Sequence, residues 1–247
     1  MIIKTDGLVI REQTTGERDK LVTVLSRENG VIRAFVNGAR NPKSKTAAAT
    51  GLLCYSDFSI DKSSKGIYTI REATAKEVFF PLRQDIVRLS LAQYFAELSY
   101  ELSPREENSD EFLRLVLNAV YLVCENKKNL SIVKAATELR MLTLAGYMPS
   151  VVACDNCGTY ESETMFFSTF TGKLWCENCK PEENTVKITN SIVAAIRHIC
   201  FSESEKVFSF SLSKDGIMAL AAVSEKYLKS TTMRNYKTLD FYKMMTE

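Results

Sequence analysis

The chain has 247 residues, of which 45% are hydrophobic and 25% charged, and its formal net charge is only +2. These values are ordinary for a globular protein with a sizeable core, and so small a charge does not by itself indicate a nucleic-acid partner. No stretch approaches the about eighteen apolar residues of a membrane span, and the N-terminus lacks the pattern of a signal peptide, so we expect a cytoplasmic protein with reduced thiols.

Residues 1–80 predict β-strands. Five short runs rich in β-branched residues alternate with polar turns, and a short helical turn at 46–50 lies between the third and the fourth. The runs are Gly7–Ile10, Leu21–Leu25, Val31–Val36, Leu52–Ile60 and Ile67–Ile70. Asn29-Gly30 predicts a type I′ hairpin turn, which needs positive φ at both residues. Five strands in this order predict an OB-fold barrel, a scaffold often used to bind single strands.

Basic residues in this region are unevenly placed. Residues 29–56 contain no acidic residue, and the densest basic part is the loop 38–45. The basic residues of this segment are Arg33, Arg40, Lys43 and Lys45. A loop of this kind on a barrel rim can contact phosphates, but a solvated surface loop has the same composition, so the pattern leaves both interpretations open. A phosphate-binding P-loop is excluded, because the second glycine is missing and the loop does not follow a strand of a βαβ unit.

From residue 81 onward the hydrophobic pattern has the helical period. The apolar stripes span residues 87–102, 112–123, 136–142, 192–199 and 217–228. Pro104 ends the first of these helices and Gly146 the third, and Asn108 with Glu111 forms a capping pattern before the second. Stripes of this kind are typical of core faces, so we expect a helical domain.

The segment 226–243 has five basic residues against one acidic residue, with four aromatic residues among them. Basic residues interleaved with aromatic ones can bind nucleic acid or an acidic peptide. A closing helix that packs its aromatic rings inward has the same composition, and we favour that interpretation.

Four of the seven cysteines form two Cys-x-x-Cys pairs separated by eighteen residues. The pairs are Cys154 with Cys157 and Cys176 with Cys179. This is the spacing of a four-cysteine zinc site, and the segment between the pairs predicts a short β-ribbon with a turn at 171–172. Disulfides require an oxidising compartment and a redox pair requires a βαβ context, so we favour zinc over both and over coincidence. Four thiolates leave no open coordination position, which predicts one structural Zn²⁺.

These patterns together predict an α+β multidomain protein. We expect an OB-fold barrel at 1–80, a helical domain in two parts at 81–150 and 183–247, and a zinc ribbon inserted at 151–182. The only histidine, His198, lies in a helical stripe, and no nucleophile elbow or glycine-rich dinucleotide loop is present. We therefore expect neither an enzyme nor a small-molecule substrate.

Several segments resemble the RecO family of bacterial recombination-repair proteins. Residues 7–11 and 17–21 are similar to the start of that family, as are Gly30 and the segment 38–44. The most specific segment is Leu144-Ala145-Gly146-Tyr147-Met148-Pro149 followed by Cys154-Asp155-Asn156-Cys157-Gly158, which resembles the family's entry into its zinc site. The order of barrel, helices, cysteine site and helices also agrees, and the C-terminal segment agrees least.

The resemblance implies a recombination mediator on the bacterial nucleoid. It implies binding of single- and double-stranded DNA, annealing of complementary strands, contact with the C-terminal tail of the single-strand binding protein SSB, pairing with RecR and help in loading RecA onto SSB-coated DNA. It also implies DNA contacts by Arg18 and Lys20. Added to the basic residues above, these give the candidate DNA-binding set Arg18, Lys20, Arg33, Arg40, Lys43 and Lys45.

Three alternatives of other classes stay open. The first is a sequence-specific DNA regulator that uses the zinc ribbon as its reader, although residues 158–175 contain one basic residue, Lys173, against Glu161 and Glu163. The second is a zinc-dependent enzyme, which metal-dependent hydrolysis of a nucleic acid would establish. The third is a structural assembly factor that binds partners without DNA.

Overall fold

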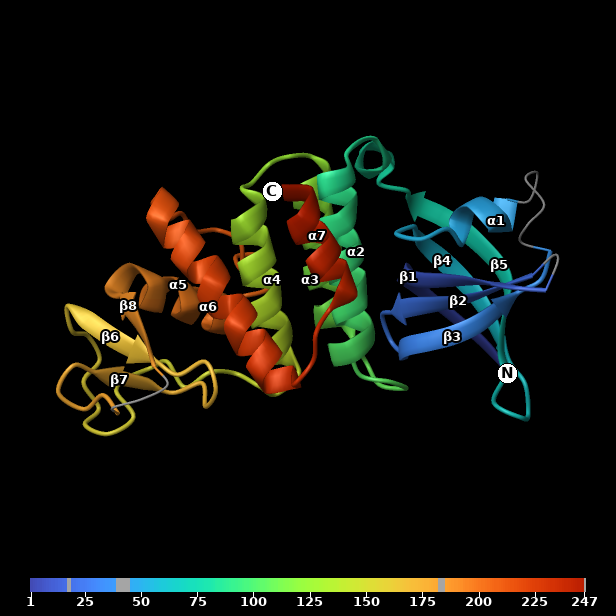
Figure 1. Ribbon diagram of the computed structural model, residues 1–247. Coiled ribbons are helices and arrows are strands. Elements are labelled where there is room, and N and C mark those ends of the chain that lie inside the picture. The colour runs from blue at the N-terminus through green and yellow to red at the C-terminus, as the bar shows by residue number, and fades with distance from the viewer. Residues whose placement is uncertain (17–18, 39–44, 182–184, 247) are drawn as a thin grey trace. The chain divides into compact units, whose positions relative to one another are not determined.

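The computed structural model describes residues 1–16, 19–38, 45–181 and 185–246, with the side chain of Lys45 excepted. The chain divides into two compact units (Figure 1). The first comprises Met1–Lys127 and Tyr236–Glu247, and the second comprises Lys128–Asn235. Within the described residues, no helix combines the length and the apolar character that crossing a membrane requires.

The first unit begins with a closed five-stranded barrel, as the sequence predicts. Its elements are β1 (Ile2–Thr15), β2 (Asp19–Ser26), β3 (Gly30–Val36), α1 (Lys45–Ala49), β4 (Tyr55–Lys62) and β5 (Tyr68–Glu77). The strand order is β1-β2-β3-β5-β4, and only the short β3–β5 contact among the described pairings is parallel. The fourth strand begins later than predicted, because Leu53 has a positive φ of 61° that a strand does not allow.

The barrel core follows the alternation that a half-buried strand requires. On β2 and β3, alternate side chains point inward, and Ala49 of α1 packs against the same core. The buried members are Val9, Val22, Val24, Ile32, Ala34, Val36, Ala49, Phe58, Ile60, Ile70 and Ala73. The short helix between β3 and β4 therefore contributes to the closed core of the barrel.

The β2–β3 hairpin exists, but the predicted type I′ turn is wrong. Ser26 pairs with Gly30, which leaves a three-residue loop, and Gly30 has a positive φ of 63° whereas Asn29 does not. A three-residue loop followed by a left-handed glycine is the next commonest hairpin connection. Glycine is required there, because a Cβ atom would lie 2.2 Å from the carbonyl oxygen of Pro104. Because Pro104 is distant from Gly30 along the chain, the local sequence does not reveal this contact.

Besides α1, the helices described in the first unit are η1 (Phe80–Gln84), α2 (Ile86–Leu102), α3 (Asp110–Cys124) and α7 (Lys237–Thr246). The middle of the predicted stripe on α2 is buried, whereas its end residues Val87 and Leu102 are only partly buried. Tyr236 just before α7 packs edge-to-face on Tyr94 of α2 with 5.9 Å between ring centroids. Tyr242 of α7 and Tyr227 are also buried, whereas Phe241 is 39% exposed, so three of the four aromatic rings of the segment 226–243 pack inward as the closing-helix interpretation requires. The N-cap position of α3 is Ser109 instead of Asn108, but the Asn108 side chain still accepts a hydrogen bond from the Asp110 amide at 3.1 Å. The Ser109 hydroxyl donates to the carbonyl oxygen of Ser26 at 2.5 Å instead of capping the helix.

A partly buried ion pair joins β1 to the β2–β3 loop of the barrel. The Arg27 guanidinium donates to both carboxylate oxygens of Asp6 at 2.8 Å, and the Tyr55 hydroxyl donates to the same carboxylate. The hydrogen bond from Arg27 outweighs the opposing effect of burial and lowers the pKa of Asp6 from 3.8 to about 2. Arg27 also pairs with Asp110 at the start of α3.

We expect this ion pair to make the free energy of unfolding depend on pH in the acidic range. Because the folded pKa lies below the unfolded one, its stabilisation is complete above pH 4 and disappears as the pH falls through about 2. Asp6→Asn should therefore cost about 2 kcal/mol at pH 7 and flatten the loss of stability between pH 4 and 2. Urea unfolding across this pH range measures the effect. Asp61→Asn, at an exposed pair with Arg71, is the control and should change little.

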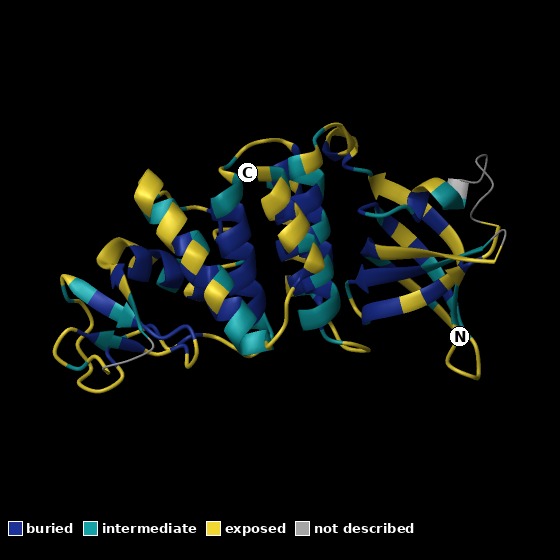
Figure 2. Ribbon diagram, viewed as in Figure 1, coloured by how far each residue is buried: buried dark blue, intermediate teal, exposed yellow. Residues whose placement is uncertain are grey.

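The second unit contains α4 (Leu130–Leu144), β6 (Thr164–Phe167), β7 (Leu174–Cys176), β8 (Val186–Thr189), α5 (Asn190–Phe201) and α6 (Lys214–Thr232). Every residue of α4 from 132 to 142 is buried, and this helix is drawn largely in dark blue in Figure 2. The predicted ribbon is confirmed as the antiparallel pair β6–β7. A third strand, β8, pairs with the other edge of β6 and was not predicted.

Candidate metal centre and nucleic-acid interface

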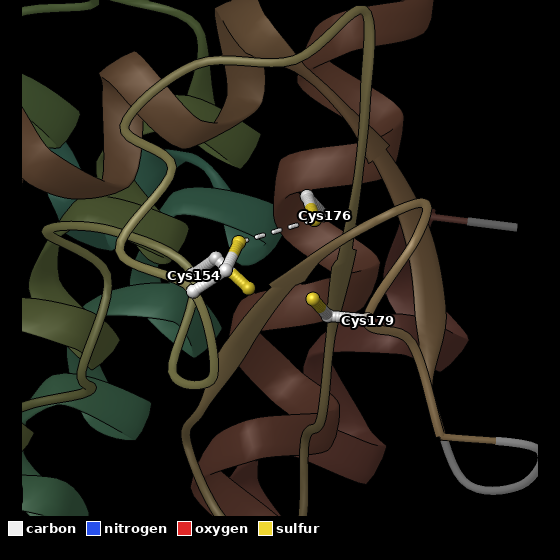
Figure 3. Close-up of side chains that lie close together, drawn as sticks. Cys154, Cys176 and Cys179 are labelled. Carbon is white, nitrogen blue, oxygen red and sulfur yellow. Dashed lines mark hydrogen bonds between the residues drawn. The ribbon is translucent and has the colours of Figure 1, made fainter.

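The four cysteines predicted as zinc ligands lie together in the second unit. Cys154 and Cys157 come from the loop after α4, whereas Cys176 ends β7 and Cys179 follows it. Figure 3 labels Cys154, Cys176 and Cys179. Each pair spans a tight turn, in which the Gly158 amide donates to the Cys154 carbonyl at 3.0 Å and the Cys179 amide to the Cys176 carbonyl at 3.1 Å. These turns direct both sulfurs of each pair toward one point.

The spacing of the sulfurs fits a tetrahedral metal. All four Sγ atoms lie within 4.8 Å of one another, and those of Cys157 and Cys176 are 3.6 Å apart. A zinc ion with bonds of about 2.3 Å places its sulfurs about 3.8 Å apart, so closing this cluster onto an ion requires shifts of at most about 1 Å. The cluster is therefore suited to hold one metal ion.

The thiols of the cluster resist simultaneous ionisation. Hydrogen bonds from the side chain and backbone of Thr159 lower the pKa of Cys157 to about 6. A hydrogen bond from the Asn156 amide lowers the pKa of Cys179. The interactions of Cys179 with Cys157 and the other sulfurs outweigh this effect and raise its pKa to about 11. At neutral pH the cluster without a cation thus keeps protons that a bound divalent cation would displace.

Two contacts hold the first cysteine pair in place. Lys173, before β7, forms an ion pair with Asp155 at 2.8 Å. Arg197 of α5 donates to the carbonyl oxygens of Val151, Val152 and Tyr160 at 2.7–2.8 Å, and its guanidinium lies 3.9 Å from the Tyr160 ring centroid. Sequence reasoning missed Arg197, because it lies in an ordinary helical stripe far from the cysteines along the chain.

The predicted DNA-binding residues are only partly described. Arg18, Arg40 and Lys43 lie outside the described residues, as does the side chain of Lys45. Lys20 is the second residue of β2 and lies on the side of the strand that carries the core residues, and its ammonium pairs with Glu12 at 3.3 Å. Arg33 is exposed on the opposite side of the barrel wall, so the structure does not bring Lys20 and Arg33 together.

A row of three residues crosses the outer barrel wall. Thr23 of β2 pairs with Arg11 of β1 on one side and with Arg33 of β3 on the other. Both arginines are exposed, and Phe35, two residues after Arg33, lies on the same side of β3. Because neighbouring strands are about 4.8 Å apart, the two arginines stand roughly 10 Å apart along one face. Sequence reasoning missed this pairing of Arg11 with Arg33, because it depends on the strand register.

Comparison with known proteins supports the resemblance. The family model for the recombination protein O N terminal matches residues 1–79, and that for the recombination protein O C terminal matches residues 83–240. The DNA repair protein RecO of Acetivibrio thermocellus is 33% identical over 244 residues, which cover 98% of this chain and 97% of that protein. The DNA repair protein RecO of Caldicellulosiruptor bescii is 30% identical, with 99% of each chain covered. This chain therefore belongs to the RecO family.

Proposed function

We propose that this protein is a DNA repair and recombination mediator that binds single- and double-stranded DNA and anneals complementary strands. The observation that carries the proposal is a closed five-stranded barrel with Arg11 and Arg33 exposed on one outer face, in a chain of the RecO family. Arginines on a rigid wall bind phosphates without reading base edges, so binding independent of sequence is expected.

The proposed DNA path follows the outer wall from Arg11 to Arg33 and continues to the basic loop. We include all of the basic residues predicted from the sequence, namely Arg18, Lys20, Arg33, Arg40, Lys43 and Lys45. Lys20 lies on the opposite side of the barrel wall from Arg33, so it would contribute only where the path passes the end of β2, by exchanging Glu12 for a phosphate, since their ion pair has little net strength. The outer wall would hold the backbone of either strand and leave the bases free to pair.

The partners proposed from the family are RecR, the C-terminal tail of SSB and, functionally, RecA. In this scheme the protein works in the bacterial cytoplasm on the nucleoid, binds SSB-coated DNA and, with RecR, helps RecA to load. No covalent chemistry is required of it. One Zn²⁺ bound by Cys154, Cys157, Cys176 and Cys179 would have a structural role, because four thiolates leave no position for a substrate.

Annealing of two complementary strands coated with SSB, without ATP, tests the function. Acceleration by this protein supports the mediator function and shows action on the SSB–DNA complex. Binding of naked strands without acceleration would leave a DNA-binding protein without the SSB contact. If a folded, zinc-replete sample neither binds nor anneals DNA, the proposal is wrong. Equal affinity for unrelated duplexes would exclude the alternative of a sequence-specific regulator.

The salt dependence of DNA binding identifies the contacts. Replacing Arg11 and Arg33 together by glutamine should weaken binding to single strands and lower the log–log salt slope by about 1.4, because each lost phosphate contact removes about 0.7. Replacing Arg40, Lys43 and Lys45 together by alanine should lower it by about 2. Arg71→Gln, at an exposed arginine of β5, is the matched control. An unchanged slope in either multiple variant removes that group of residues from the interface.

A further inference from the structure

The three-stranded sheet of the second unit has two chemically different faces. Met165 of β6 pairs with Cys176 of β7 and Ile188 of β8, and all three are buried on the inner face. The next residue of β6, Phe166, pairs with Trp175 on one side and Lys187 on the other. Because successive side chains alternate between faces, these three residues form a row on the outer face.

This outer row remains accessible to a partner. Phe166 and Trp175 are only partly buried, Lys187 is exposed, and Figure 2 shows buried and intermediate residues alternating along β6. The ammonium of Lys180, also exposed, lies 4.7 Å from the centroid of the Phe166 ring. The rings of Phe166 and Trp175 and the ammonium group of Lys187 thus occupy adjacent positions on one sheet, and Lys180, from the segment after β7, adds a second ammonium group beside Phe166. We call this set of four residues the outer aromatic face.

The chemistry of this face matches an unpaired nucleotide. An accessible aromatic ring on a sheet stacks with a base of any sequence, and a nearby ammonium binds the adjoining phosphate. The acidic residues Glu161, Glu163 and Glu177 are exposed but lie outside the three strands. Duplex DNA cannot use the rings in this way, because its bases already stack on one another.

We propose that the outer aromatic face is a second contact for single-stranded DNA, in which a base stacks on Trp175 and the adjoining phosphates bind Lys180 and Lys187. This inference rests on the proposed function, since it assumes that the protein binds DNA. It adds a site in the second unit, distinct from the barrel wall in the first. The site was not predicted from the sequence, because β8 was not predicted and both lysines lie outside residues 158–175.

The protein provides its own reporter, since Trp175 is the only tryptophan of the chain. The full-length, zinc-replete protein is titrated with oligo(dT), and its tryptophan emission is followed beside the anisotropy of a labelled oligonucleotide. Stacking should quench Trp175 emission in a saturable curve that parallels the anisotropy. A duplex should bind with much less quenching, because its bases are not available to stack.

Variants separate the outer aromatic face from the rest of the molecule. Lys180→Gln with Lys187→Gln should lower the log–log salt slope by about 1.4 while the metal content stays the same. Lys206→Gln, at an exposed lysine of the same unit, is the matched control and should leave the slope and the quenching unchanged.

The outcomes distinguish this inference from the proposed function. If the anisotropy shows binding while Trp175 emission does not change, the second contact is wrong and the proposed function stands. Equal quenching by duplex and single strands, or an unchanged slope in the double variant, also overturns the second contact. If the anisotropy shows no binding to any DNA, the proposed function fails, and this inference fails with it.

Discussion

Replacement of Cys176 by serine is expected to abolish metal binding and to unfold the ribbon formed by β6, β7 and β8. Those strands have only 4, 3 and 4 residues, and a sheet of this size has too little buried surface to be stable alone. Structural zinc in small zinc-finger peptides contributes about 10–16 kcal/mol, which far exceeds what such strands supply. Serine is a poor zinc ligand, so the fourth bond is lost.

The chain offers a matched control for this substitution. Cys124 of α3 is as buried as Cys176, with 5% of each residue exposed, but it lies outside the cluster. Cys124→Ser should keep one equivalent of zinc and cost only about 1–3 kcal/mol, the usual price of burying a hydroxyl. Metal content and limited proteolysis within residues 158–175 distinguish the two variants. A Cys176→Ser protein that keeps its zinc and its protease resistance would show that the cluster is not the metal site.

The cysteine cluster was fully predictable from the sequence, whereas the basic interface was not. Four cysteines in two close pairs encode their geometry locally, because each tight turn directs two sulfurs together regardless of the rest of the fold. The relation of Arg11 to Arg33 depends on strand register, and a shift of one residue would place them on opposite sides. Lys20 and Arg33 look equivalent in the sequence but occupy opposite sides of the barrel wall.

The same distinction explains the errors in the fold. Periodic stripes predicted the five strands and the long helices, because burial of one face is a local pattern. The predicted type I′ turn at Asn29-Gly30 was wrong. The contact that requires glycine at position 30 is made with the carbonyl oxygen of Pro104, which is distant in the sequence. The strand β8 was missed because its four residues are too few for alternation to stand out, and its partner β6 lies about twenty residues earlier.

The second large effect is expected in the helical core of the second unit. Glu138 of α4 is completely buried and pairs with Lys134 at 2.8 Å, and Lys134 also pairs with Glu225 of α6 at 3.1 Å. The Ser224 hydroxyl donates to the second carboxylate oxygen of Glu138 at 2.7 Å. Burial disfavours the charge of Lys134, but the two carboxylates outweigh this and raise its pKa, so the lysine stays protonated.

Glu138→Ala should therefore destabilise the second unit by about 3–5 kcal/mol, because it removes the closer carboxylate from a buried ammonium group. Urea unfolding followed by the emission of Trp175, which lies in this unit, measures the loss. The Glu203–Lys206 pair provides a contrast, since its atoms are as close, at 2.7 Å, but both side chains are more than half exposed. Glu203→Ala should cost less than about 1 kcal/mol.

A double variant separates the cost of depriving a buried charge of one of its two partners from the net strength of the Lys134–Glu138 pair. Lys134→Met with Glu138→Leu replaces both charges by apolar groups of similar volume, and it should be close to neutral or stabilising. If the double variant were as unstable as Glu138→Ala, the pair itself would stabilise the fold. A cost of Glu138→Ala below about 1 kcal/mol would mean that water reaches Lys134. The description of this ion pair as buried in the core would then be contradicted. The expected pattern is a large loss in the single variant and a small change in the double one, because a buried ammonium group that keeps only the more distant of its two carboxylates is incompletely compensated.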